Sequence, residues 1–453
     1  MPFATLSAPS TTPDRMAARM EKFVIEGGAP LSGSIVPAGN KNAALPALAA
    51  CLLTEDRVVV RNVPRIRDVD AMLGLLKGLG VEVNWLEDNV VALKASDVDP
   101  LAVDLNLAEK IRASFLIAGP LLARFRRADM PTPGGDVIGR RRLDPHLDAF
   151  RALGTQVAHE PAFGYRLTAS NGLKACDFFM DEPSVMATEN ALMAAALTPG
   201  STVIHNAASE PHVQDVARML LQMGARIEGI GSNVLIVHGS DRLGGADYTI
   251  GPDYIEIGSF IALAAVTGGE LRIRGGATDD LRMTRMAFER LGCRVDLDAD
   301  DVVVPPDQTL RVRDDEGGAV SKIEDGPWPA FPADLTSIAL ALATQADGLV
   351  MIFEKMFENR LFFVDKLVTM GARVILCDPH RAVVSGPSRL HGERMESPDI
   401  RAGMAMLIAA LCAEGQSEIG NIRQIDRGYE RIDERLRSLG ARIERVASQP
   451  VAA

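Results

Sequence analysis

Charged residues at helix starts and in glycine-rich turns are the positions where this sequence could carry out chemistry. Lys41 and Asn42 open the run KNAALPALAA, and a lysine at a helix amino terminus provides an anion site. The segment 130–146, MPTPGGDVIGRRRLDPH, places three arginines and several glycines around Asp136, which favours phosphate binding. Asp334 follows PWPAFPA, where it could be a positioned base or the N-cap of the next helix.

Three further arginines occupy equivalent edges of the later part of the chain. Arg360 ends FENR, Arg401 ends SPDIR and Arg427 lies in QIDRGYE. If the chain wraps around a shared cleft, these arginines converge there and select a small polyanionic substrate. The irregular segment 305–333 ends in the aromatic and proline residues before Asp334, and a loop of this length favours a functional role.

Composition excludes several other classes of protein. The 48 basic and 60 acidic residues give a net charge of −12, which argues against nucleic-acid binding. The longest apolar runs, 42–53 and 402–413, are about a dozen residues long, too short to span a membrane. Motifs of the forms GxxxxGK[ST] and GxSxG are absent, as is GxGxxG after a strand, which argues against the site classes that these motifs mark. With seven histidines and no HExxH motif, we predict no metal centre.

The ends and the cysteines add two expectations. Residues 1–19 begin with MPFATLSAPSTTPDR, which lacks the apolar core of a signal peptide and predicts a disordered tail. The five cysteines are widely spaced without a CxxC pair, which predicts buried thiols in a reducing cytoplasm rather than disulfides or zinc.

A short tag recurs along the chain and reveals internal repeats. The pattern (Leu/Met)-Gly-x-x-(Val/Ile) occurs six times, at spacings of 74, 70, 68, 79 and 69 residues. Its glycines are Gly80, Gly154, Gly224, Gly292, Gly371 and Gly440. Each tag closes an amphipathic helix, where glycine permits a left-handed cap and the β-branched residue starts a strand.

Each tagged helix is preceded by an alanine- and leucine-rich helix and a strand, as in MAAALTPGSTVIHNA. Nearly all-apolar helices are buried on every side. We therefore predict six α/β units, each with one interior helix and one outer helix. Six units of about 70 residues exceed one core, so three units in each of two domains is the expected grouping.

Several ordered motifs together resemble one known family. They are PAGNKNAALPALAA, KIRASFLIAGPLLARF, PGGDVIG, PSVMATEN, FPADL, FENRLFFV, SPDIRAG and QIDRGYERIDERLRSLGARIE. Over about 21–445 the chain resembles the UDP-N-acetylglucosamine enolpyruvyl transferases of the EPSP synthase superfamily. The resemblance implies an α/β fold: a two-domain inside-out α/β barrel of six βαβαββ-type units with buried helices. It places one domain at 41–251 and the other at 20–40 with 252–448.

The resemblance also implies an activity. Members transfer the enolpyruvyl group of phosphoenolpyruvate to the 3-hydroxyl of UDP-N-acetylglucosamine and release phosphate, through a tetrahedral ketal. This is the first committed step of peptidoglycan synthesis, and it needs no metal or organic cofactor. We accordingly expect a cytoplasmic monomer with small-molecule substrates and no nucleic-acid or membrane partner.

Carried over to this sequence, the family's catalytic positions are Lys41, Asp136, Asp334 and Arg427, with Asp136 on a lid at 131–141 and the site between the domains. Asp334 is the implied base for the acceptor hydroxyl, and Asp136 the implied proton donor to C3 of phosphoenolpyruvate. The implied substrate ligands are Lys41, Asn42, Arg112, Arg141, Arg142, Leu143, Asp144, Pro145, Ser184, Val185, Asp334, Met356, Arg360, Asp399, Arg401 and Arg427.

Four departures from the family pattern leave alternatives open. Asp136 replaces the commoner cysteine, which predicts resistance to fosfomycin because that antibiotic alkylates the thiol. Met186 replaces a glycine, and Ser209 and Tyr254 replace arginines. These three replacements leave open how the chain recognises the sugar nucleotide. One alternative is enolpyruvyl transfer to another acceptor, such as a different nucleotide; the other is a non-catalytic sensor of UDP-sugar.

Overall fold

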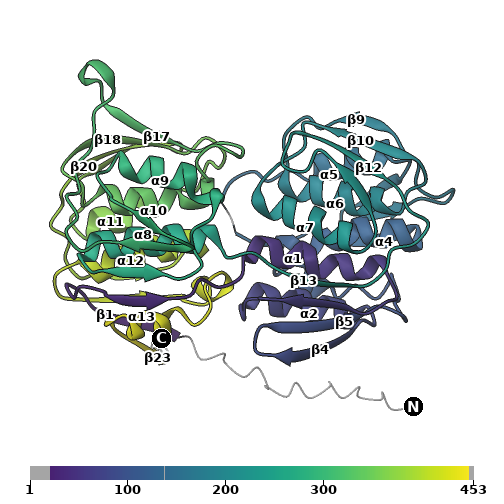
Figure 1. Cartoon of the computed structure of the whole chain (residues 1–453), viewed down its shortest axis with the longest axis horizontal. Coiled ribbons are helices and arrows are strands. Elements are labelled where there is room, and N and C mark those ends of the chain that lie inside the picture. The colour runs from purple at the N-terminus through teal and green to yellow at the C-terminus, as the bar shows by residue number, and fades with distance from the viewer. Residues whose placement is uncertain (1–20, 137, 448–453) are drawn as a thin grey trace, which may run out of the picture.

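Two lobes make up the part of the chain that the computed structural model describes, residues 21–136 and 138–447 (Figure 1). Buried apolar side chains form two large clusters. The cluster of the first lobe comes from 43–250, and that of the second lobe from 23–35 with 254–443. The predicted tail 1–19 lies outside the described residues, and the proposed domain boundaries stay a prediction.

The first lobe carries three small sheets, with strand orders β13-β3-β5-β4, β6-β8-β7 and β11-β12-β10-β9. Their strands are β3 (Val58–Arg61), β4 (Glu82–Glu87), β5 (Val90–Lys94), β6 (Arg127–Pro131), β7 (Gln156–Glu160), β8 (Gly164–Thr168), β9 (Asp177–Phe179), β10 (Ser201–His205), β11 (Arg226–Glu228), β12 (Val234–His238) and β13 (Ala246–Thr249).

The second lobe repeats the plan with the orders β21-β22-β1-β23, β15-β16-β14-β2 and β17-β18-β20-β19. Its strands are β1 (Glu21–Glu26), β2 (Gly33–Ile35), β14 (Leu271–Ile273), β15 (Asp296–Asp298), β16 (Asp301–Val304), β17 (Ser321–Glu324), β18 (Gly348–Phe353), β19 (Val374–Asp378), β20 (Arg381–Gly386), β21 (Arg394–Glu396), β22 (Gln416–Gly420) and β23 (Arg442–Ala447). All six described sheets are open, so the predicted barrel is an arrangement of sheets around helices rather than a closed sheet.

The helices alternate between an apolar and an amphipathic type, as the repeats predict. The apolar inner helices are α1 (Lys41–Ala50), η2 with α4 (Arg112–Ile117 and Ala118–Phe125), α6 (Val185–Ala196), α8 (Tyr254–Thr267), α10 (Thr336–Ala343) and α12 (Ile400–Cys412). The amphipathic helices are α2 (Arg67–Gly78), α5 (Asp144–Ala152), α7 (Pro211–Gln222), α9 (Arg282–Glu289), α11 (Val364–Thr369) and α13 (Ile432–Ser438). Shorter elements are η1 (Cys51–Leu53), α3 (Leu105–Ala108), η3 (Asp279–Leu281), η4 (Glu316–Gly318), η5 (Ala333–Leu335) and η6 (Ile425–Arg427).

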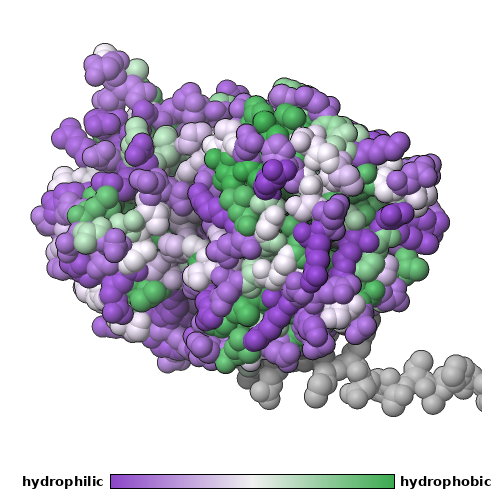
Figure 2. Space-filling view, turned by 45° about the vertical axis from the view of Figure 1, so that its right-hand side comes forward, coloured by the Kyte–Doolittle hydropathy of each residue, from purple (hydrophilic) through white to green (hydrophobic). Residues whose placement is uncertain are grey.

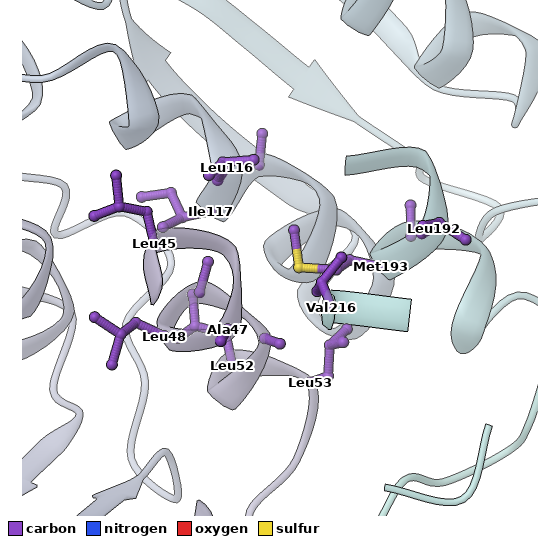
Figure 3. Packing of buried hydrophobic residues seen from close by; sticks show 14 of the residues in the cluster. Leu45, Ala47, Leu48, Leu52, Leu53, Leu116, Ile117, Leu192, Met193 and Val216 are labelled. Atoms are coloured by element: carbon purple, nitrogen blue, oxygen red, sulfur yellow. The ribbon is translucent and has the colours of Figure 1, made fainter. Parts of the chain in front are cut away.

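The inner helices form the core of each lobe because their side chains are apolar all round. In α1 every residue except Asn42 is buried. Figure 3 shows Leu45 of α1 near Ile117, with Leu48 of α1 and Met193 of α6 in the same cluster. In the second lobe α8, α10 and α12 pack against one another. Each fully buried leucine contributes about 1.5–3 kcal/mol relative to an exposed one, so these helices hold their sheets in place.

All six tag glycines have the predicted left-handed backbone. Their φ angles lie between 77° at Gly292 and 102° at Gly371. At Gly80 the helix closes through a hydrogen bond from Val81 N to Leu76 O of 3.0 Å, and β4 starts directly afterwards. The tag therefore ends each amphipathic helix and directs the chain into a strand, as predicted.

The amino-terminal strands complete the second lobe. Strand β1 lies between β22 and β23, seen in Figure 1 as a purple strand among yellow ones. The chain crosses to the first lobe at 36–40 and returns at 251–253, and the two crossings pair through Gly39 and Pro252. A Cβ on Gly39 would lie 1.7 Å from the carbonyl oxygen of Asn62, so only glycine fits this close approach.

Other features extend or correct the sequence expectations. Polar side chains cover most of the face seen in Figure 2, and the apolar residues form several separate groups. No helix in 21–136 or 138–447 has the length and apolar character needed to cross a membrane. Cys51 and Cys293 are buried, but Cys377 is exposed on the edge strand β19, so the prediction of buried thiols is wrong there. The segment 305–333 includes the regular strand β17.

The tag glycines make a testable contribution to stability. In Gly224→Ala the new Cβ meets no atom within 4 Å, so only the positive φ of 99° is penalised. We expect the free energy of unfolding to fall by about 1–2 kcal/mol. The control is Gly244→Ala, whose Cβ would have neighbours only at 3.8 and 4.0 Å. Urea denaturation of both variants measures the difference, and equal stabilities would contradict the role of the tag.

Candidate active site

The six inner helices all begin at the cleft between the lobes. Their first turns supply much of its lining. The residues concerned are Lys41, Asn42, Arg112, Ala113, Val185, Met186, Tyr254, Ile255, Ala333, Asp334, Ile400 and Arg401. A helix amino terminus presents unpaired N–H groups and a partial positive charge, so six of them at one cleft favour an anionic ligand.

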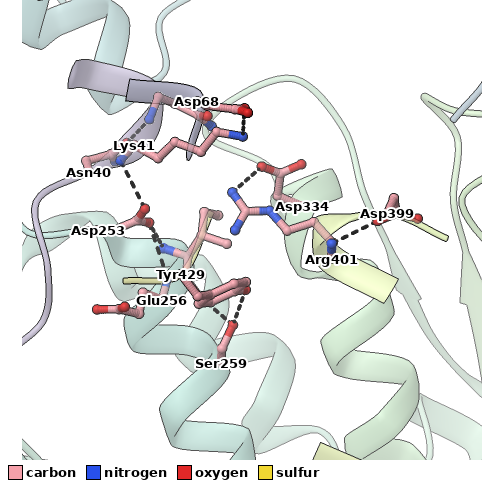
Figure 4. A network of polar contacts seen from close by, with 12 residues as sticks. Asn40, Lys41, Asp68, Asp253, Glu256, Ser259, Asp334, Asp399, Arg401 and Tyr429 are labelled. Atoms are coloured by element: carbon pink, nitrogen blue, oxygen red, sulfur yellow. Dashed lines mark hydrogen bonds and ion pairs between the residues drawn. The ribbon is translucent and has the colours of Figure 1, made fainter. Parts of the chain in front are cut away.

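Short polar side chains cap three of these helices (Figure 4). Asn40 Oδ1 accepts from the backbone N–H groups of Asn42 and Ala43, at 2.8 and 3.1 Å. Asp253 caps α8 in the same way. Asp399 Oδ1 accepts from Arg401 N at 2.8 Å, so this predicted substrate ligand is buried as a helix cap and is not part of the cleft lining.

A chain of ion pairs joins the two lobes across the cleft. Lys41 Nζ lies 2.9 Å from Asp68 Oδ2, and Arg427 Nε lies 2.8 Å from Asp68 Oδ1. Arg427 of the second lobe also pairs with Asp136. Because Lys41 and Arg427 contact the same carboxylate, they are close enough to bind one phosphate group together.

Asp68 is central to this chain, although sequence reasoning missed it. Its side chain is only 5% exposed. Burial raises the pKa of Asp68, but the charges and hydrogen bonds of Lys41 and Arg427 lower it by more. The pKa of Asp68 therefore lies below its usual value. In the sequence Asp68 is only an acid in the first turn of an outer helix, a common place for a carboxylate.

Asp334 lies between two buried arginines. Its oxygens are 2.9 Å from Arg360 Nη2 and 2.8 Å from Arg401 Nη2. Burial raises the pKa of Asp334, but Arg401 and then Arg360 outweigh it and hold the pKa well below its usual range. Neither η5 nor α10 has a side-chain cap, which contradicts the alternative that Asp334 is an N-cap. The carboxylate is ionised and weakly basic.

The predicted lid segment reaches the second lobe. Gly135, Asp136, Ile138 and Arg141 line the cleft, and the carbonyl of Ile138 accepts from the N–H of Asn359 at 2.9 Å. The described part of 131–141 therefore forms part of the wall between the lobes, with Asp136 facing Arg427.

Most of the other predicted ligands also line the cleft. They are Asn42, Arg112, Arg141, Val185, Met356 and Arg360. Arg112 donates to the backbone oxygen of Arg141, and at 3.0 Å to that of Arg142. Burial lowers the pKa of Arg112 to about 10, and the charge of Arg141 contributes. Because carbonyls rather than carboxylates hold Arg112, its charge remains available to an anion.

A second group of predicted ligands lies at the starts of α5 and α6, outside the cleft lining. Arg142 pairs with Asp181 on the surface. Leu143 precedes α5, which begins at Asp144 and Pro145, and Ser184 precedes α6. Contacts of these residues with a nucleotide stay a prediction.

Among the cleft residues that sequence reasoning did not select are four that matter below. They are Glu189, Glu210, His212 and Trp328. A signal existed for Glu189, which is the one acidic residue in the otherwise alanine-rich helix VMATENALMAAA. Trp328 belongs to the aromatic segment before Asp334, whereas His212 had no distinguishing pattern.

Comparisons with known proteins agree with this architecture. Residues 25–436 match the family described as EPSP synthase (3-phosphoshikimate 1-carboxyvinyltransferase). A UDP-N-acetylglucosamine 1-carboxyvinyltransferase of Bradyrhizobium diazoefficiens is 56% identical over 94% of this chain and 98% of the relative. One of Treponema denticola is 53% identical over 94% of this chain and 99% of its own length.

Solved structures give the same fold. The enolpyruvyl transferase NikO from Streptomyces tendae superposes with a TM-score of 0.84 at 25% identity, covering 95% of this chain and all of NikO. An EPSP synthase from Acinetobacter baumannii gives a TM-score of 0.71 at 17% identity, covering 94% of this chain and 100% of its own.

The ion-pair chain predicts a measurable response to phosphate. Asp68→Asn leaves Lys41 and Arg427 without their shared carboxylate, and breaking such a buried pair costs about 3–5 kcal/mol. We expect a lower thermal midpoint, and inorganic phosphate should raise that midpoint more in Asp68→Asn than in the wild type. Asp247→Asn, which breaks an exposed pair with Arg61, is the control. An equal phosphate effect in all three proteins would contradict the shared anion site.

Proposed function

The chain belongs to the EPSP synthase family, and we propose that it transfers the enolpyruvyl group of phosphoenolpyruvate to the 3-hydroxyl of UDP-N-acetylglucosamine with release of phosphate. The observation that carries this proposal is the cleft, in which Lys41 and Arg427 share one carboxylate and the charge of Lys41 also acts on the ionised Asp334. The relatives that are 46–56% identical carry the name of this activity. We further propose a role in peptidoglycan synthesis, in the cytoplasm and as a monomer.

Phosphoenolpyruvate combines a phosphate and a carboxylate, and the cleft offers cations for both. In the proposed complex its phosphate replaces Asp68 and Asp136 as the partner of Lys41 and Arg427. Arg112, Arg141, Arg360 and Arg401 are the remaining cations of the lining. Burial strengthens these contacts, because charge-assisted hydrogen bonds are stronger at low dielectric.

The proposed reaction is an addition followed by an elimination. The acceptor oxygen forms a bond to C2 of phosphoenolpyruvate while C3 gains a proton from Asp136. In the elimination the bond between C2 and the phosphate oxygen breaks, and the ionised Asp136 takes a proton back from C3, which restores the double bond. The proton that Asp334 accepts from the hydroxyl leaves with the phosphate. In the proposed complex the phosphate draws Arg427 away from Asp136. Without that cation beside it, the Asp136 carboxyl can carry the proton that it donates to C3.

The low basicity of Asp334 defines its role in the first step. An ionised carboxylate first accepts a hydrogen bond from the 3-hydroxyl and so orients it. The hydroxyl becomes strongly acidic only as its oxygen bonds to C2, and at that stage even a weak base takes the proton. We therefore propose that proton transfer to Asp334 occurs late in the addition.

The nucleotide part of the acceptor needs contacts of its own. We assign them to Asn42 and Met356 in the cleft, to the starts of α5 and α6, and to Asp399 beside α12. The residues at the two helix starts are Arg142, Leu143, Asp144, Pro145, Ser184 and Val185.

A panel of acceptors tests the proposed function. Phosphate release from phosphoenolpyruvate is measured with UDP-N-acetylglucosamine, other nucleotides and shikimate 3-phosphate. We expect release only with UDP-N-acetylglucosamine. Release with a different nucleotide would support the alternative acceptor, whereas binding without release would support the UDP-sugar sensor.

Asp334→Asn tests the late base. We expect turnover to fall by about 10²–10⁴-fold, as for other general bases, while calorimetry still detects binding of UDP-N-acetylglucosamine. Asp301→Asn removes a carboxylate from a surface pair with Arg272 and should leave turnover unchanged. A near-normal rate in Asp334→Asn would remove this residue from the mechanism.

Asp136 variants test the proton donor. Asp136→Asn cannot supply a comparably acidic proton and should be almost inactive, whereas Asp136→Cys should retain activity. The wild type should resist fosfomycin, because a carboxylate attacks the epoxide poorly, and Asp136→Cys should form a covalent adduct at position 136. Mass spectrometry detects the adduct. Inactivation of the wild type by fosfomycin would contradict the assignment.

A further inference from the structure

Five residues of the cleft lining carry no positive charge and are here called the Glu189–His212 wall. It consists of Glu189, Glu210, His212, Tyr254 and Trp328. Glu210 acts electrostatically on both Glu189 and Tyr254, and the rings of Tyr254 and Trp328 lie 5.9 Å apart. The cations of the lining are Lys41, Arg112, Arg141, Arg360, Arg401 and Arg427. Besides these six cations, the cleft therefore offers polar side chains that carry no positive charge.

Two side chains of the wall are buried with unpaired polar atoms. Glu189 is 1% exposed and His212 is 5% exposed. Within the described chain, Glu189 Oε1 and His212 Nδ1 have no hydrogen-bond partner. Leaving such a group unpaired costs about 1–3 kcal/mol, so a ligand that supplies the missing partners gains affinity.

The protonation states indicate what kind of ligand fits. Burial raises the pKa of Glu189 well above its usual value, and Glu210 adds to this effect. Burial lowers the pKa of His212 to about 4. Burial therefore favours the carboxylic acid form of Glu189, and His212 is a neutral imidazole at neutral pH; in these forms each side chain has one donor and one acceptor. Such a pair suits hydroxyl or amide groups and offers no charge to a phosphate.

We propose that Glu189 and His212 form the subsite for the uncharged sugar ring of the acceptor and select it through its hydroxyl or acetamido groups. This inference rests on the proposed function, which requires a neutral ring beside Asp334. His212 is near enough to Asp334 and Arg401 for both charges to act on it. Met186 and Tyr254, two departures from the family pattern, also line the cleft and would help to shape this subsite.

Titration calorimetry with UDP and UDP-N-acetylglucosamine tests the subsite, because UDP lacks the sugar; free UDP also carries one more phosphate charge, so the effect of each variant is compared with the wild type for each ligand separately. Glu189→Leu and His212→Leu should each lose about 10–100-fold in affinity for UDP-N-acetylglucosamine and change less than about twofold for UDP. Glu189→Gln keeps one donor and one acceptor and should lose less than about fivefold. His391→Leu, at an exposed histidine, is the matched control. Should Glu189→Leu fail to fold, Glu189→Asp withdraws the carboxyl by one methylene and should also lose selectivity for the sugar.

The outcomes separate this proposal from the proposed function. Equal losses for UDP and UDP-N-acetylglucosamine, or no loss for either, would overturn the subsite even if the wild type turns over. If the variants lose affinity only for the sugar nucleotide but the wild type releases no phosphate, the subsite is supported and enolpyruvyl transfer is overturned. A wild type that shows no detectable binding of UDP-N-acetylglucosamine would overturn the subsite together with its premise.

Discussion

Burial of six apolar helices is the constraint on which the rest of this structure depends. Each helix is covered by sheets and by its neighbours, and all six begin at the cleft between the lobes. Their amide ends concentrate positive potential there. Because the first turns of these helices meet at the cleft, side chains such as Lys41 and Arg401 reach a common ligand without long loops. The fold thus creates the anion site, and the side chains refine it.

The charged residues of the cleft are held by one another in this structure. Asp68 binds Lys41 and Arg427, and Asp334 binds Arg360 and Arg401. Each carboxylate keeps two cations near a position where an anionic substrate can bind. An anionic substrate that takes the place of such a carboxylate meets cations that are already buried. Its binding therefore avoids the full cost of burying unpaired charge. The same pairing weakens Asp334 as a base, so its action belongs late in the proposed addition.

The repeats made much of the fold predictable, because local patterns determine them. The six tag glycines and the apolar helices predicted the number of units and the ends of helices correctly. The Lys41, Asp334 and Arg427 positions could be found because they stand next to recognisable motifs. Asp68 and His212 could not, since only packing between segments far apart in sequence gives them a role. Asp399 stands at a conspicuous position, and its carboxylate caps α12; its contact with a nucleotide stays a prediction.

The central claim is that this cleft joins phosphoenolpyruvate to a sugar nucleotide through a tetrahedral ketal. Rapid chemical quench of the wild type, with one label in phosphoenolpyruvate and another in UDP-N-acetylglucosamine, tests it most directly. The account predicts an adduct that carries both labels and still contains phosphate, formed before free phosphate is released. Release of phosphate without such an adduct, or consumption of phosphoenolpyruvate in the absence of the sugar nucleotide, would contradict it.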